Sequence, residues 1–461
     1  MKHRFSMSMV AALFVASVLV FYGVPTSAAP TSAEDLGAAP TTADEVPQEI
    51  KDAFEDFKQQ KFEDAVKKLD AARAKNPDLA PSELILAQWF SVINQPQALR
   101  QAIEVAVTKH PGDPEAFVIL GELNLQNGGI TEAELLFKQA EAVNAKFNES
   151  QKRKTEISRR ILMGQAQVFA VRGKRPEAIA RLNSILAVDP ANVATLNLLG
   201  LIQFNEGNVQ ETLKAYEAVK KAQPETLLPE ARVAMLYQQR GNEGDAAQSQ
   251  TYMVAALNKA KQDPQVRIVA TQWSLQRGNL KDAVSQSEFA LRLAPDSADA
   301  QMLRGIVALY EQNYAVAETN FSKVLANSPS NFAATNNLAL ALCEQKDDAK
   351  LQRADEYALV NVRSFQKQPE AFSTRAWVLF KKGDYNGALQ HIQRSLQLSN
   401  GNMSQDTAVY LASILDAIGG EENKKQATEI ITKLLQNTKT LFPMKAQAQA
   451  LARKLGVTTT P

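Results

Sequence analysis

The sequence predicts an all-α fold, a solenoid of about eleven helix-turn-helix units that ends in a capping helix. The first observation behind this prediction is a period of 34 residues, which Gly173, Gly207 and Gly241 keep. Three pairs of prolines repeat the same spacing, which chance does not produce. These pairs are Pro77 and Pro111, Pro190 and Pro224, and Pro295 and Pro329.

The second observation is that each period holds two apolar-periodic segments, as in Ala194 to Asn205 and Gln210 to Lys221. Apolar residues at this spacing predict amphipathic helices, and Gly207-Asn208 between them predicts a turn. Glycine suits a helix end because it adopts positive φ, and proline cannot continue the helix before it. Each unit is therefore expected to be two helices joined by a turn.

The third observation is a fixed register of small and large residues. Gly121, Gly200 and Gly305 are each followed 12 residues later by a small residue, which lets two helices approach closely, while large residues such as Tyr216 fill the grooves. In this register the chain resembles the tetratricopeptide repeat family, whose first helix carries a Leu-Gly pair, here Leu199-Gly200. The resemblance implies units that stack into a right-handed superhelix, with a concave groove lined by the first helices.

Extending this register places the repeat array over residues 46–442. Longer intervals mark insertions, the largest at Lys146 to Lys154, and Gly419 to Lys425 is expected to form an overlong turn. After Pro443, apolar residues at helical spacing predict a capping helix over 443–456, followed by a tail over 457–461. The units are expected to start near residues 46, 80, 114, 159, 193, 227, 264, 298, 332, 369 and 405.

The N-terminus has the charged, apolar and small-residue zones of a secretory signal peptide. Basic residues at positions 2 to 4 precede an apolar stretch from Met9 to Val24, and a cut after Ala28 gives a signal peptide over residues 1–28. Residues 29–45 are small and polar, which predicts a disordered linker. We therefore expect an exported protein, periplasmic or extracellular. The alternative is an uncleaved membrane anchor formed by residues 9–24, the one route to membrane contact.

The composition disfavours an enzyme, a metalloprotein and a nucleic-acid-binding protein. The 51 Lys+Arg against 50 Asp+Glu leave a formal net charge of +1, so the chain has no electrostatic footprint for a phosphate backbone. The single cysteine, Cys343, excludes multi-cysteine zinc sites, and the three histidines lie far apart in sequence. No GxxxxGK[ST], GxGxxG or HExxH motif occurs. We therefore predict no catalytic residue, metal site or cofactor.

The residues that could carry chemistry have simpler structural interpretations. Cys343 has no histidine in its own unit or in the unit before it, so we interpret it as a small helix residue rather than a nucleophile. His110 is interpreted as capping a helix end, and His391 as structural. The aromatic residues of the first helices are expected to pack in the core rather than to face the groove. They are Trp89, Trp273, Trp377 and Tyr310.

The densest basic cluster is Lys152-Arg153-Lys154 with Arg159-Arg160. It could dock an acidic protein or lipid head groups. The favoured interpretation is a solvated helix extension in which Glu149 and Glu156 pair locally with these cations.

The resemblance also implies a partner-binding groove, because tetratricopeptide repeats usually hold an extended peptide or a partner helix on one face of their first helices. Here this face is amide-rich, apolar and poor in charge, and amide side chains can pair with an extended backbone. It lacks the lysines and arginine with which some members grip an acidic C-terminal tail. The same amides could instead be ordinary exposed helix formers. The face consists of Asn197, Leu201, Asn205, Ala231, Met235, Gln239, Ile268, Gln272, Gln276, Met302, Ile306, Tyr310, Asn336, Leu340 and Glu344.

Together these features predict a non-enzymatic scaffold that binds protein or peptide partners in a concave groove. The alternative is a periplasmic repeat subunit of an envelope polysaccharide synthesis or export machine, or of an outer-membrane assembly machine. In that case the array would position a synthase or a barrel that resides in another chain.

Overall fold

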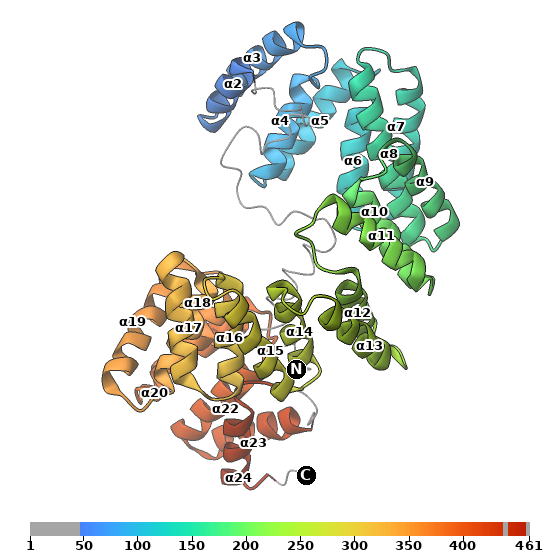
Figure 1. Cartoon of the computed structure of the whole chain (residues 1–461). Coiled ribbons are helices and arrows are strands. Elements are labelled where there is room, and N and C mark those ends of the chain that lie inside the picture. The colour runs from blue at the N-terminus through green and yellow to red at the C-terminus, as the bar shows by residue number, and fades with distance from the viewer. Residues whose placement is uncertain (1–46, 437–440, 458–461) are drawn as a thin grey trace. The chain divides into compact units, whose positions relative to one another are not determined.

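The computed structural model describes residues 47–436 and 441–457, which form 23 α-helices, α2 to α24, and no strand (Figure 1). The predicted signal peptide (1–28), the alternative anchor (9–24) and the linker (29–45) lie outside the described residues, as does most of the predicted tail. The all-α prediction is confirmed for the described part of the chain. Among these residues no helix is long and apolar enough to cross a membrane.

The helices form eleven consecutive pairs, and α24 follows the last pair. Each pair is packed antiparallel and contacts the next, as a helical repeat array requires. The pairs are α2 (Gln48–Lys58) with α3 (Phe62–Lys75), α4 (Ser82–Val92) with α5 (Pro96–Lys109), α6 (Glu115–Gln126) with α7 (Ile130–Lys146), α8 (Gln151–Val171) with α9 (Arg175–Val188), α10 (Val193–Asn205) with α11 (Val209–Ala222), α12 (Pro229–Arg240) with α13 (Asp245–Lys259), α14 (Pro264–Gln276) with α15 (Leu280–Leu293), α16 (Ala298–Tyr310) with α17 (Tyr314–Asn327), α18 (Phe332–Cys343) with α19 (Asp348–Ser364), α20 (Pro369–Lys381) with α21 (Tyr385–Leu398), and α22 (Gln405–Ile418) with α23 (Glu421–Leu435).

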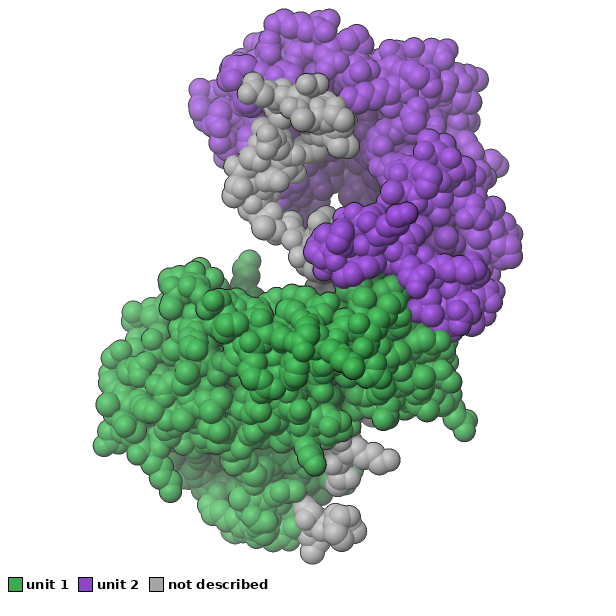
Figure 2. Space-filling model, in the orientation of Figure 1, with its two compact units in different colours: residues 1–18, 227–461 green, residues 19–226 purple. Residues whose placement is uncertain are grey.

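The chain divides into two compact units, coloured separately in Figure 2. The N-terminal unit contains α2 to α11, and its apolar core is broken into several clusters. The C-terminal unit contains α12 to α24, and one continuous core runs in it from Ile268 to Ala452. Each unit is described separately below.

Turn and cap residues explain where the helices begin and end. Gly207, between α10 and α11, has φ of 81°, the left-handed conformation that glycine adopts without strain. Asn192 starts α10 by accepting a hydrogen bond from the backbone N–H of Thr195 at 3.0 Å. The two segments predicted around this turn match α10 and α11 to within one residue at each end.

The small residues of the first helices make room for aromatic rings. A Cβ built on Gly121 of α6 would lie 2.9 Å from the ring of Phe137 on α7, and one built on Gly164 of α8 would lie 2.6 Å from Cε2 of the same ring. The predicted close approach of the helices is therefore present. The group that fills the space beside Gly121 is the ring 16 residues along the chain, not the small residue at 12.

Two loop predictions need correction. Gly419 and Gly420 alone separate α22 from α23, so the residues from Glu421 to Lys425 belong to a helix and the predicted overlong turn is wrong. The Lys146 to Lys154 insertion mostly lengthens helices, since α7 runs to Lys146 and α8 begins at Gln151. The Ser150 side chain caps α8 by accepting from the backbone N–H of Arg153 at 3.1 Å.

Candidate protein-binding surface

The first helices line the inner side of the C-terminal unit. From α12 to α22, every first helix contacts the first helix of the following pair, whereas successive second helices make no comparable contact in the described part of the unit. Pairs that converge on one side and separate on the other produce a curved stack, with the first helices on the inner, concave side. This inner face is where the sequence predicts partner binding.

The structure brings most of the predicted groove residues onto neighbouring helices and separates three of them. Asn197, Leu201 and Asn205 lie on α10 in the N-terminal unit. The others lie on α12, α14, α16 and α18, four successive first helices of the C-terminal unit. The C-terminal unit therefore holds the larger candidate surface.

Exposure decreases along this surface. Gln239 on α12 is exposed, and Gln272 and Gln276 on α14 are half-buried. Ile306 and Tyr310 on α16 are buried, because the apolar side chains here belong to the continuous core. Ala231, Ile268 and Asn336 are also buried. Within the predicted set, α12 and α14 thus offer the more accessible amides.

Asn336 is a buried amide without a hydrogen-bond partner in the described part of the chain. Its exposed fraction is 0%, and neither its Nδ2 nor its Oδ1 makes a hydrogen bond. Leaving a buried polar group unsatisfied costs about 1 to 3 kcal/mol. This side chain therefore keeps both its donor and its acceptor capacity on the inner side of α18.

The predicted groove residue Glu344 is engaged within the protein. It accepts hydrogen bonds from Nε1 of Trp377 at 2.6 Å and from Nζ of Lys381 at 2.8 Å. The Trp377 ring stacks on Tyr410, with 4.6 Å between the ring centroids. Sequence reasoning missed Lys381 and Tyr410, although Trp377 and Lys381 occupy the groove register of the unit that starts at 369.

The aromatic residues of the first helices pack in the core, which confirms their predicted role. Trp89, Trp273, Trp377 and Tyr310 are each at most 8% exposed. The Trp273 indole N–H donates to Oγ of Ser249 at 2.7 Å, so its polar edge is satisfied inside the protein.

Cys343 lies in an environment that opposes nucleophilic chemistry. Its side chain is buried, its thiol donates to the Leu340 carbonyl at 3.3 Å, and burial raises the pKa of the thiol well above its usual range. A thiol held in its protonated form is a weak nucleophile. His110 follows the last residue of α5 and contacts Glu83 at 3.3 Å, and His391 bonds the Gly387 carbonyl within α21. Among the described residues no group of three or more His, Cys, Asp or Glu could hold a metal ion.

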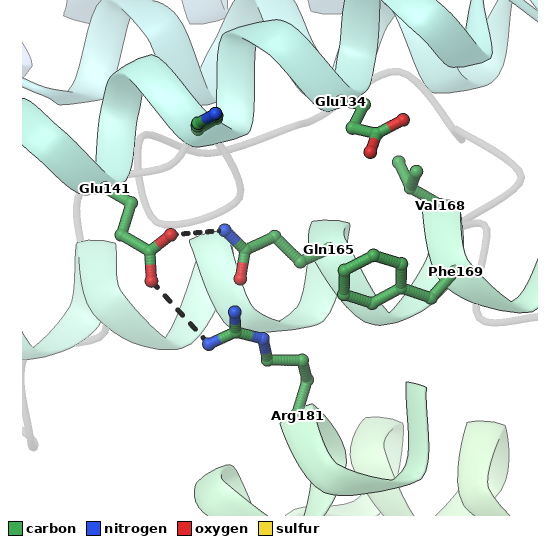
Figure 3. Close-up of a pocket in the computed structure, with 7 residues that line it drawn as sticks. Glu134, Glu141, Gln165, Val168, Phe169 and Arg181 are labelled. Atoms are coloured by element: carbon green, nitrogen blue, oxygen red, sulfur yellow. Dashed lines mark hydrogen bonds and ion pairs between the residues drawn. The ribbon is translucent and has the colours of Figure 1, made fainter. Parts of the chain in front are cut away.

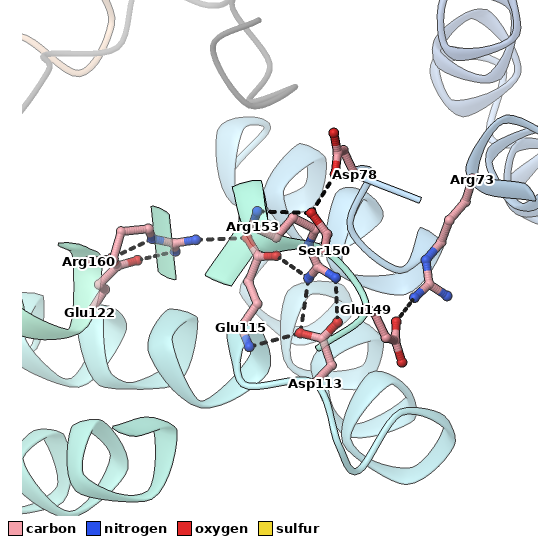
Figure 4. A network of polar contacts seen from close by, with 9 residues as sticks. All are labelled: Arg73, Asp78, Asp113, Glu115, Glu122, Glu149, Ser150, Arg153 and Arg160. Atoms are coloured by element: carbon pink, nitrogen blue, oxygen red, sulfur yellow. Dashed lines mark hydrogen bonds and ion pairs between the residues drawn. The ribbon is translucent and has the colours of Figure 1, made fainter. Parts of the chain in front are cut away.

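The basic cluster forms a buried ion-pair network in the N-terminal unit rather than a solvated surface (Figure 4). Arg153, only 5% exposed, pairs with Asp113 and Glu115, each at 2.8 Å. Arg160 pairs with Glu115 at 2.8 Å and with Glu122 at 2.7 Å. Two of the cations offered for docking an acidic partner are therefore neutralised inside the unit.

The local pairing predicted for this cluster is half right. Arg159 does pair with Glu156. Glu149, however, pairs with Arg73 on α3 at 2.9 Å, and Ser150 bonds Asp78 (Figure 4). These contacts attach the start of α8 to helices far earlier in the chain, which residue spacing alone does not reveal.

A small open cavity of about 190 Å³ lies between α7, α8 and α9 (Figure 3). Glu141 accepts from Nε2 of Gln165 at 2.9 Å and contacts Arg181 at 3.6 Å, so its charge is compensated within the wall. By helical period, Gln165 and Phe169 point away from the groove register of α8. The cavity is separate from the candidate partner surface.

The tetratricopeptide repeat family matches residues 163–225 and 303–350. The chain therefore contains tetratricopeptide repeats, as the register predicted. No curated protein matches the sequence.

Solved structures of helical repeat proteins are similar to parts of the chain. PilW, described as a widely conserved type IV pilus biogenesis factor, is 19% identical over 47% of this chain and 96% of its own, with a TM-score of 0.36. A tetratricopeptide repeat protein from Parabacteroides merdae is 18% identical over 65% of this chain and 99% of its own, with a TM-score of 0.35. Yeast Tom70 is 15% identical over 89% of this chain and 87% of its own, with a TM-score of 0.35. At these scores we draw no conclusion about function from the likeness.

Proposed function

We propose that this tetratricopeptide repeat protein is a non-catalytic scaffold that binds protein or peptide partners on the inner face of its first helices. The observation that carries the proposal is the convergence of four successive first helices, α12 to α18, whose amide and apolar side chains share one inner side of the C-terminal unit. A continuous face of this kind is the usual binding surface of a helical repeat array.

The chemistry of the face suits an uncharged, extended segment of a partner. Gln239, Gln272 and Gln276 each offer a donor and an acceptor, the two groups that an extended backbone presents. Met302 and Leu340 supply half-buried apolar contacts beside them. Glu344, the one charged residue of the predicted set, is already paired with Lys381 at 2.8 Å.

We also propose that the protein is exported, to the periplasm or outside the cell, because the N-terminal sequence carries the three zones of a signal peptide. N-terminal sequencing of the protein from its native envelope fraction tests this proposal. A first residue near Ala29 supports export with cleavage, and a first residue at Met1 replaces it with the anchor over residues 9–24.

The binding proposal is tested by affinity purification from envelope extract, followed by mass spectrometry. Gln272→Arg with Gln276→Arg places two charges on the inner face of α14. The matched control, Gln248→Arg with Gln390→Arg, places the same charges on exposed positions of the second helices α13 and α21. The inner-face pair should lose the partners that the wild type and the control retain.

The composition of the recovered proteins separates the two functions that the sequence left open. Varied partners support a general scaffold. One stoichiometric set of envelope proteins supports a subunit of a synthesis, export or assembly machine. Equal recovery by the inner-face pair and by the wild type would reject the assigned surface.

A further inference from the structure

Helix α24 (Lys445–Lys454) lies alongside α22 in the C-terminal unit, and the two helices run in the same direction. The backbone N–H of Met444 donates to Oδ1 of Asp406 at 3.1 Å, and Nζ of Lys454 pairs with Asp416 at 2.6 Å. Both contacts join residues 38 positions apart, so one end of α24 is matched to each end of α22.

The face of α22 that receives α24 continues the inner face of the earlier first helices. Asp406, Val409, Ser413 and Asp416 recur at spacings of three, four and three residues, which places them on one side of the helix. The apolar side chains of the C-terminal segment are buried in the same core as α22 and α23. They are Phe442, Met444, Ala448, Leu451 and Ala452.

A third polar contact holds the middle of α24. Nε2 of Gln447 donates to the Tyr314 hydroxyl at 3.1 Å, across 133 positions of sequence. Tyr314 is the first residue of α17, so α24 contacts an earlier pair as well as the pair that precedes it. A helix that only covered the last apolar face would need none of these three polar contacts.

The charges of the two partners are complementary. Residues 441–457 contain Lys445, Arg453 and Lys454 and no acidic residue, whereas the only charged residues of α22 are Asp406 and Asp416. Asp406 accepts at the N-terminal end of α24, where a carboxylate is favoured by the helix dipole. A buried acid in this place serves recognition of a helix N-terminus better than it serves packing.

We propose that the face of α22 between Asp406 and Asp416, completed by α23 and Tyr314, is a binding site for a short basic amphipathic helix. Its resident occupant is α24, and a partner helix of the same chemistry competes for it. Such a helix presents a free backbone N–H to Asp406, small or unbranched apolar residues at spacings of three and four, and a cation to Asp416. The site lies on other helices than the amides of α12 and α14, so it stands or falls independently of the proposed function.

The test uses the full-length chain and a fluorescent synthetic peptide of residues 441–457, with a scrambled peptide as control. Ala448→Asp with Leu451→Asp places two charges on the buried side of α24 and releases it from the site. The peptide should bind this released chain at least about tenfold more tightly than the wild type. Asp416→Lys in the released chain should reverse most of that gain, whereas Asp299→Lys, the same charge change at an exposed position of α16, should not.

A second measurement on the wild type avoids any dependence on how the released chain folds. Excess peptide labelled with heavy isotopes should raise hydrogen exchange at residues 445–454 of the chain while α22 stays protected. Unchanged exchange at saturating peptide, or binding that does not depend on Asp416, would overturn the proposal. Dimerisation of the released chain by exchange of α24 would make a second copy the occupant and would overturn the assignment to a partner.

Discussion

Gly200 lies against the ring of Tyr216: a Cβ built on Gly200 would be 2.9 Å from Cδ1 of that ring. We predict that Gly200→Leu destabilises the protein, because the added side chain must displace a buried ring. Overpacking typically costs about 1 to 3 kcal/mol. Replacing a mid-helix glycine returns at most about 1 kcal/mol of helix propensity. A net loss of about 1 to 2 kcal/mol is expected in urea unfolding.

Gly112→Leu is the matched control for this substitution. A Cβ built on Gly112 meets nothing within 4 Å, and its φ is not in the left-handed region. The control should stay within about 0.5 kcal/mol of the wild type, as surface substitutions usually do. A loss as large as that of Gly200→Leu would show that the contact with Tyr216 is not the cause.

Arg153→Met tests the buried ion-pair network of the N-terminal unit. Removing the guanidinium leaves Asp113, and partly Glu115, as buried carboxylates without their counter-ion. Breaking a buried pair from one side typically costs about 3 to 5 kcal/mol. We expect a loss of this size in the urea unfolding of the N-terminal unit.

Arg159→Met provides the comparison, because Arg159 pairs with Glu156 within one helix and both side chains are about one-third exposed. Pairs of this kind contribute at most about 1 kcal/mol. Similar losses for Arg153→Met and Arg159→Met would contradict the structural role assigned to the buried network.

The sequence predicts the array well because its signals are local. The period of 34 residues and the turn glycines locate α10 and α11 to within one residue, since helix periodicity and caps act over a few positions. The burial of Arg153 could not be predicted in this way. Its partner Asp113 lies 40 residues earlier, and a basic run near a helix start resembles a solvated face.

The candidate site was predictable as a face but not as a surface. A spacing of four residues finds Met302, Ile306 and Tyr310 on one side of α16, yet it does not show how closely the neighbouring first helices approach. That approach depends on packing between pairs, which buries Ile306 and Tyr310. The contact of Gln447 with Tyr314 spans 133 positions and leaves no trace in either local sequence.

Asp406 should make stability depend on pH. Burial raises the pKa of its carboxyl to about 7, against 3.8 for an ordinary aspartate. Between these values the folded protein holds a proton that the unfolded chain has lost, so the free energy of unfolding falls as the pH rises and stays low above pH 7. Asp406→Asn keeps an acceptor for the Met444 N–H but does not ionise.

The measurement compares urea unfolding of the wild type and Asp406→Asn at pH 5 and pH 8. The variant should gain about 1 to 3 kcal/mol relative to the wild type over this interval, since each unit of pKa shift is worth about 1.4 kcal/mol. Asp299→Asn, at an exposed position of α16, should follow the wild type. A difference between wild type and Asp406→Asn that does not change with pH would contradict the raised pKa.

Cys343 should be unreactive in the folded protein. It is buried on α18, and burial raises the pKa of its thiol, so the thiolate that attacks a disulfide reagent is scarce at pH 8. We expect modification by 5,5′-dithiobis(2-nitrobenzoic acid) to be at least about a hundredfold slower in buffer than in urea, because it requires local opening of the unit. The chain has one cysteine, so unfolding should release a signal of one thiol. Fast modification of the native protein would show that the first helix α18 opens readily and that its inner side is more accessible than the structure indicates.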